Sequence, residues 1–178
     1  SAMLNATTAT QNVAVGRQAM GLGVTTGNAN TAIGYATMYD ITSGANNIGV
    51  GSSALENLTT GNLNVAIGQG AMVTATGNSN CVIIGTYAGD SINNTDADGT
   101  VAIGRDSLGA LTSGAENTAV GFETLKTTGT GINNTAIGYR ALTLAPDGAD
   151  HNTAVGSQAL ASLNHGSADG NTAIGRSA

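Results

Sequence analysis

The sequence predicts an all-β protein, a parallel β-solenoid (β-roll) of about ten coils that are 17–19 residues long. A five-residue core, Asn-(Thr/Val)-Ala-(Ile/Val)-Gly, recurs from one end of the 178-residue chain to the other. Most core glycines are followed three and four residues later by a small residue and then Leu or Met, and a second glycine precedes the next core. The core glycines are Gly16, Gly34, Gly51, Gly68, Gly85, Gly104, Gly121, Gly138, Gly156 and Gly175.

Each core predicts a short strand. Because side chains alternate along a strand, the Ile or Val before the glycine shares one face with the β-branched residue two positions earlier. Asn, Ala and Gly share the other face, which lacks bulk, and we expect another subunit to approach closely there. The Leu or Met lies in the other half of each coil, where we expect it to help fill the interior. The Gly-rich segments between cores predict turns.

The fifth core differs from the others. Residues Asn80 to Gly85 contain one more residue than the other cores, and the longest inter-core loop, Asp90 to Gly99, follows. A one-residue insertion turns the side chains over to the opposite face unless a bulge absorbs it. We therefore expect a local irregularity in this coil.

Composition limits the classes of function. Trp is absent and aromatic residues make up 3% of the chain, so a core of large side chains is not expected and oligomerisation is the natural source of further stability. Five Lys and Arg stand against eleven Asp and Glu, without a basic stripe, so no nucleic-acid partner is expected. No run has transmembrane length, and we expect no membrane insertion by this segment. The single cysteine, Cys81, is expected to be a small buried residue.

The two ends are considered apart from the repeats. Residues 1–3, Ser-Ala-Met, are typical of a tag remnant, which leaves residues 4–178 as a single repeat domain. The chain ends three residues after Gly175, early in what should be another coil. We expect it to be a piece of a longer protein.

Several cores resemble a known class of repeats. Residues 30–35 (NTAIGY), 134–142 (NTAIGYRAL) and 152–160 (NTAVGSQAL) resemble the shaft repeats of phage tail fibres and related bacterial surface fibres. They are similar, more distantly, to the head repeats of trimeric autotransporter adhesins, which form a left-handed parallel β-roll. The resemblance covers residues 12–175. It implies a side-by-side homotrimer and an extracellular location on a virion or bacterial cell surface.

The predicted function follows from the architecture and the resemblance. We expect a structural or adhesive fibre segment that projects, or contributes to, host or surface recognition, with a surface glycan or cell-envelope receptor as partner. The alternative is a Thr-rich ligand-binding solenoid such as an ice-binding protein, because Thr recurs on the β-branched face. Against it, the Thr row is interrupted by Val13, Ile48, Val65 and Val101.

One loop carries a metal-like pattern. Residues 94–99, Asn-Thr-Asp-Ala-Asp-Gly, match the first half of a calcium loop, with Asn94, Asp96 and Asp98 as the candidate ligands. The twelfth position of such a loop should be Glu, but here it is Arg105. We therefore favour an acidic, solvated turn and expect neither a metal nor a cofactor.

Catalysis is not expected, whereas surface contacts are. A hydrolytic site needs a nucleophile, a base and an orienting group in one pocket. The only histidines, His151 and His165, lie in or near predicted turns of a stacked rod. The residue after each core glycine is the most variable of the repeat, and exposed aromatic side chains there can contact glycans or proteins. The candidate contact residues are Tyr35, Phe122 and Tyr139.

Overall fold

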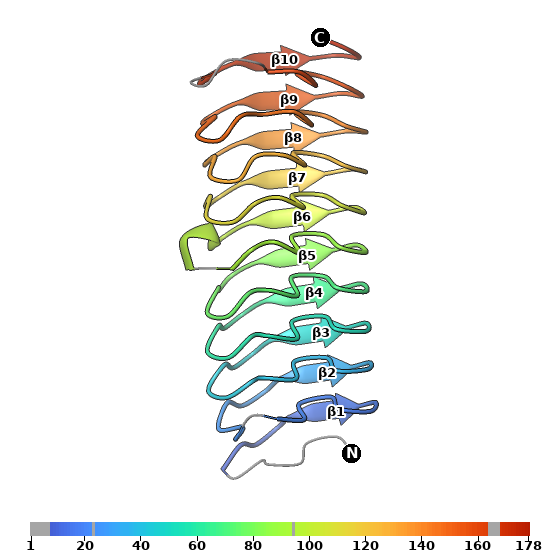
Figure 1. Ribbon diagram of the computed structural model, residues 1–178, viewed down its shortest axis with the longest axis vertical. Helices are drawn as coiled ribbons and strands as arrows, with labels where there is room; N and C mark the ends of the chain where they lie inside the picture. The colour runs from blue at the N-terminus through green and yellow to red at the C-terminus, as the bar shows by residue number, and fades with distance from the viewer. Residues whose placement is uncertain (1–7, 23, 94, 164–167) are drawn as a thin grey trace.

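The chain winds into a single stack of ten coils (Figure 1). The computed structural model describes residues 8–22, 24–93, 95–163 and 168–178. Each coil contributes one three-residue strand, and a short 3-10 helix, η1 (Thr95–Ala97), interrupts the loop between the fifth and sixth strands. The strands are β1 Val13–Val15, β2 Thr31–Ile33, β3 Ile48–Val50, β4 Val65–Ile67, β5 Val82–Ile84, β6 Val101–Ile103, β7 Thr118–Val120, β8 Thr135–Ile137, β9 Thr153–Val155 and β10 Thr172–Ile174.

The strands form one parallel sheet in which spatial order equals sequence order, β1 to β10. Equivalent residues pair along the stack, so that Ala119 of β7 opposes Ala136 of β8, which opposes Ala154 of β9. With neighbouring strands about 4.8 Å apart, ten rungs make a rod about 45 Å long. The predicted parallel β-solenoid of about ten coils is confirmed.

The core glycines stack on one another immediately after the strands. Gly68 adopts a φ of 134°, and a Cβ at this position would collide with the carbonyl group of Gly85 in the next coil. The same relation links Gly85 to Gly104. Only glycine combines this backbone conformation with so close an approach.

The Asn-Ala-Gly face points into the interior of its own chain. Ala66 and Ala136, the middle residues of β4 and β8, are fully buried, whereas the outer strand residues are half-buried or exposed. A Cβ on Gly49 would lie 2.8 Å from Cγ2 of Thr37 and 3.1 Å from Cε of Met38. The space beside this face is thus filled by the second half of the coil. The prediction that this face meets another subunit was wrong.

The Leu and Met residues four positions after the core glycines fill the interior, as predicted. Met20, Met38, Leu55, Met72, Leu108, Leu125 and Leu142 are all fully buried. We call residues two to six after each core glycine the return segment. It packs opposite the strand, and its outward side chains form a second face of the rod, the return face.

A ladder of asparagines runs inside the stack at the position before eight of the ten strands, with Cys81 and Thr100 in that position before β5 and β6. The side-chain oxygen of Asn117 accepts hydrogen bonds from N (3.0 Å) and Nδ2 (3.1 Å) of Asn134. Nδ2 of Asn134 also donates to the Ala149 carbonyl at 2.7 Å, and Asn152 repeats the pattern on Asn134. Each amide therefore joins neighbouring coils and satisfies backbone groups that stacking buries.

The fifth coil keeps the strand register. Val82, Ile83 and Ile84 pair residue for residue with β4 and β6, so the predicted irregularity is absent from the strand. The reason is that Cys81, not Asn80, occupies the ladder position, as its N–H donates to Oδ1 of Asn64. The additional length lies in the loop that contains η1, which protrudes from the stack in Figure 1.

Candidate ligand-contact surface

The three aromatic residues proposed as surface contacts lie at equivalent positions, just beyond the strands. Tyr35 and Tyr139 are each about half exposed, and Phe122 is partly buried. Phe122 and Tyr139 belong to adjacent coils, whereas Tyr35 lies five coils before Phe122. The structure therefore brings together two of the three and leaves Tyr35 apart.

The rings stack along the rod axis. Phe122 and Tyr139 are nearly parallel, with an interplanar angle of 7° and ring centroids 5.7 Å apart. The guanidinium of Arg105 lies 5.8 Å from the Phe122 centroid, and that of Arg140 lies 5.3 Å from the Tyr139 centroid. Arg17 covers Tyr35 in the same way at 5.8 Å. These ring faces are already engaged within the chain, so a ligand would meet mainly ring edges and guanidinium groups.

An ion-pair cluster adjoins the aromatic stack. Glu123 binds Nζ of Lys126 through Oε1 at 2.7 Å and Nε of Arg140 through Oε2 at 2.7 Å. Hydrogen bonds from Lys126 and Arg140 lower the pKa of Glu123, and the same contact with Glu123 raises the pKa of Arg140. The cluster thus remains ionised at neutral pH. It carries one more positive than negative charge.

The return segment that carries Arg140 has a left-handed backbone at two positions. Arg140, two residues after Gly138, and Leu142, four residues after it, both adopt the left-handed conformation, with φ of 52° and 51°. The Arg140 N–H donates to the Phe122 carbonyl of the preceding coil, and the Leu142 N–H donates to the Ala159 carbonyl of the following coil. Arg140 is exposed, while Leu142 is fully buried.

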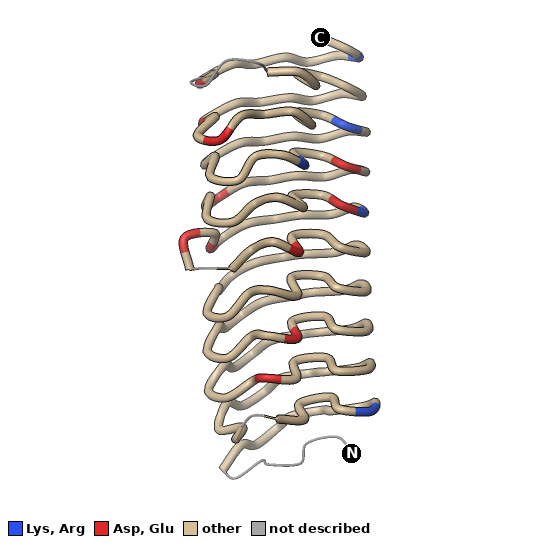
Figure 2. Tube along the Cα trace, viewed as in Figure 1, with Lys and Arg blue, Asp and Glu red and all other residues tan. Residues whose placement is uncertain are grey.

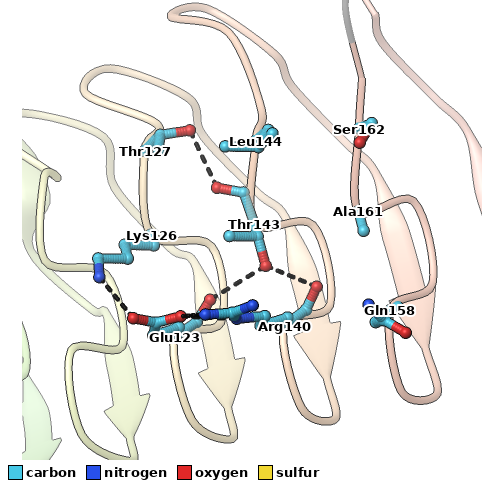
Figure 3. A pocket seen from close by; sticks show the side chains of 9 residues that line it. All are labelled: Glu123, Lys126, Thr127, Arg140, Thr143, Leu144, Gln158, Ala161 and Ser162. Carbon is cyan, nitrogen blue, oxygen red and sulfur yellow. Dashed lines mark hydrogen bonds and ion pairs between the residues drawn. The ribbon is translucent and has the colours of Figure 1, made fainter.

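A depression of about 490 Å³ opens on the return face beside the cluster (Figure 3). Its lining forms three rows, each with one residue from each of the coils that begin with β7, β8 and β9. The row nearest the strand turn holds Glu123, Arg140 and Gln158; the next holds Lys126, Thr143 and Ala161; the outermost holds Thr127, Leu144 and Ser162. The depression combines two cations, one carboxylate, hydroxyl and amide groups, and an exposed leucine.

The candidate metal ligands and the histidines are not among the residues that line this depression. Asn94 lies outside the described residues, Asp96 is exposed in η1, and Asp98 accepts a hydrogen bond from the Ser79 N–H at 2.9 Å. Among the described residues, no three His, Cys, Asp or Glu side chains are grouped so that they could hold a metal ion. His151 is exposed, and His165 lies outside the described residues.

Sequence reasoning missed the residues of the depression. Glu123, Arg140 and Gln158 each stand two residues after a core glycine, and Lys126 and Thr143 each stand five residues after one. Aligning the coils by their glycines places Glu123 directly beside Arg140. That opposite charge in adjacent coils was the available signal.

Comparison with protein-family models, curated proteins and solved structures gives no match. Within the part of the chain that the structure describes, no helix is long and apolar enough to span a membrane.

Proposed function

We propose that this chain is an extracellular segment of a homotrimeric fibre on a virion or bacterial cell surface. The segment projects a recognition element or contributes to host or surface recognition itself. One observation carries the proposal: the outward face of the sheet is uncharged and carries an unbroken column of Ile and Val along the whole rod. Figure 2 places the charged residues on the turns and return segments, away from the strands.

The outward sheet face consists of the first and third residues of every strand. The third residue is Ile or Val in all ten strands, and the first is Val, Ile or Thr. Val15, Ile33 and Ile137 are exposed, by 55%, 40% and 40%. At about 3.3 Å per strand residue and about 4.8 Å per rung, the face has a footprint of about 450 Å². Thr occupies half of the first positions, and Ile or Val fills the rest of this footprint. Exposed apolar patches of this order are often functional.

A second and third copy of the chain suit this face. An uncharged partner surface of equal length, with the same spacing of about 4.8 Å between rungs, is provided by the same face of another copy. Copies arranged in parallel around a common axis bring equivalent rungs together, as closed cyclic symmetry requires. The resemblance to fibre-shaft repeats supports three copies. The sheet face thus replaces the Asn-Ala-Gly face as the subunit contact.

The internal bonding of the rod suits a projecting element. Among the described residues, each inner coil bonds to its two neighbours, through strand pairing, the asparagine ladder and return-segment hydrogen bonds. Such solenoids are quasi-one-dimensional, so reach grows with the number of coils. We propose no catalytic role for this segment.

Solution mass tests the proposal. Light scattering should give three times the chain mass of 17.3 kDa. Ile67→Asp together with Ile103→Asp should yield folded monomers, because each places a carboxylate on the outward sheet face. Leu144→Asp is the matched control, since Leu144 is similarly exposed on the return face. A wild-type chain that is a folded monomer at micromolar concentration would overturn the proposal, and so would equal dissociation by the control.

A Thr-rich ligand-binding solenoid is a second candidate function, because threonines are stacked in one column on the outward sheet face. Thr118, Thr135, Thr153 and Thr172 pair in register on four consecutive strands. Their hydroxyl groups form a regular array beside the Ile/Val column, which suits an ordered water lattice. Thermal hysteresis by a monomeric protein, reduced by Thr135→Lys, would favour ice binding. A trimer without thermal hysteresis would exclude it.

A further inference from the structure

Cationic and aromatic residues are concentrated in a few adjacent coils. Lys and Arg number five in the whole chain, and three of them are Arg105, Lys126 and Arg140. Phe122 and Tyr139 are two of its five aromatic residues. These side chains join neighbouring coils, because Phe122 stacks on Tyr139 and Arg140 pairs with Glu123. Arg140 and Tyr139 are nevertheless exposed, so the cluster can also meet a ligand.

The shape of the adjoining depression suits a small polar ligand. It spans three rungs, or about 10 Å between its outer coils, which is the length of one or two sugar rings. Gln158 offers an amide group, and Oγ1 of Thr143, which donates to the Arg140 carbonyl at 2.6 Å, can accept a hydrogen bond from a ligand. Leu144, which is 49% exposed, offers an apolar surface. Ligand sites typically combine an apolar contact surface with a small number of polar groups around it.

The charge of the cluster favours an acidic ligand. Glu123 engages Nε and Nη2 of Arg140, and among the described residues Nη1 of Arg140 has no acceptor. A guanidinium has five N–H donors and binds carboxylates in a planar, paired geometry. Arg140 can therefore keep Glu123 and receive a second carboxylate from solvent. The local excess of one positive charge contrasts with the net charge of −6 of the whole chain.

We propose that this depression binds an acidic saccharide, with Arg140 pairing with the sugar carboxylate and Gln158 and Thr143 hydrogen-bonding the ring hydroxyls. The site lies on the return face, opposite the outward sheet face, so it is accessible in a monomer and in the proposed trimer. Three copies of a weak site on one fibre segment would strengthen attachment through avidity. The proposal goes beyond the fibre role and does not depend on the oligomeric state.

Binding is tested by calorimetry and by NMR titration on the full chain. The acidic probes are 3′-sialyllactose and a glucuronate-containing disaccharide, and the reference probes are lactose and inorganic phosphate. At least one acidic probe should bind with a dissociation constant of about 1 mM or less, and lactose and phosphate at least about tenfold more weakly. Saturation by neither acidic probe at about 10 mM would overturn the proposal. So would lactose or phosphate that binds equally well, the latter by showing a simple anion site.

Matched variants locate the site. Arg140→Gln and Ser162→Glu should each weaken binding of the acidic probe at least about tenfold, the first by removing the cation and the second by repelling the carboxylate. Ser91→Glu makes the same charge change at the equivalent position four coils earlier, so it should bind as wild type does. Circular dichroism confirms that each variant is folded. Retained binding in Ser162→Glu, or equal loss in Ser91→Glu, would refute the assignment.

Discussion

In the fifth coil the strand has a larger buried residue than in the other coils, and the return segment has a smaller one. This difference predicts the result of a double-mutant cycle. Ile83 stands where the other strands have Ala or Gly, and Gly89 stands where the other return segments have Leu or Met. A Cβ on Gly89 would lie 2.9 Å from Cδ1 of Ile92 and 3.4 Å from Cδ1 of Ile83, so both isoleucines border the space that a larger residue at 89 would need. Ala136→Ile combined with Leu142→Gly transfers this arrangement to the eighth coil.

The magnitudes follow from burial. Ala136 is fully buried, so Ala136→Ile alone overpacks the interior and should cost about 1–3 kcal/mol of unfolding free energy. Leu142→Gly alone removes a fully buried side chain, at a cost of about 2–5 kcal/mol. Glycine adopts the left-handed conformation of residue 142 without strain, which offsets about 1 kcal/mol of that loss in unfolding free energy. If the two side chains share one space, the double variant should lose about 1–3 kcal/mol less than the sum of the two single losses.

The assay is urea unfolding followed by circular dichroism. Protein concentration is held fixed, because association makes apparent stability depend on it. Tyr139→Ser, at a half-exposed position of the same coil, serves as a control that should change stability little. Additivity of the two core substitutions within about 0.5 kcal/mol would refute the shared space.

Three further predictions concern the ladder and the charge cluster. Asn134→Ala removes the donor to one buried carbonyl and the acceptor of one buried N–H, which should cost about 2–6 kcal/mol in the same urea assay, against little for the exposed Thr130→Ala. Cys81→Asn with Thr100→Asn should raise the melting temperature, because it restores the ladder where the buried Thr100 hydroxyl finds no hydrogen-bond partner among the described residues. The lowered pKa of Glu123 means that its ion pairs stabilise the fold at neutral pH. The difference in melting temperature between wild type and Glu123→Gln should therefore vanish as pH falls from the usual 4.5 through the lowered pKa.

The strands and their register could be predicted from the sequence, but the direction of each face could not. Alternation places Asn, Ala and Gly together, yet it does not say whether that face points inward. The return segment decides this, because buried residues such as Leu142 pack against the strand. Leu142 adopts a left-handed φ of 51°. This conformation is unfavourable for leucine, so the sequence does not predict it. Hydrogen bonds between neighbouring coils stabilise it instead.

The candidate site could be predicted only in part. The aromatic position after the core glycine was recognised, because Phe122 and Tyr139 vary within an otherwise constant repeat. The depression was missed, because Glu123, Arg140 and Gln158 lie 17 or 18 residues apart along the chain. They become neighbours only when coils are compared column by column. In a solenoid, the residues of a surface site therefore come from equivalent positions of neighbouring repeats rather than from one stretch of sequence.

The column of stacked glycines bears on how such a rod changes its length. Gly68 meets Gly85 as Gly85 meets Gly104, so the joint between two coils is almost the same wherever it falls. Duplicating or deleting one repeat of the gene would shift the rod length by about 4.8 Å and leave both new joints sterically compatible. The fifth coil is the exception, since its matched Ile83 and Gly89 must be copied together. Evolution can therefore adjust the reach of this rod by recombination between repeats, without redesigning a core.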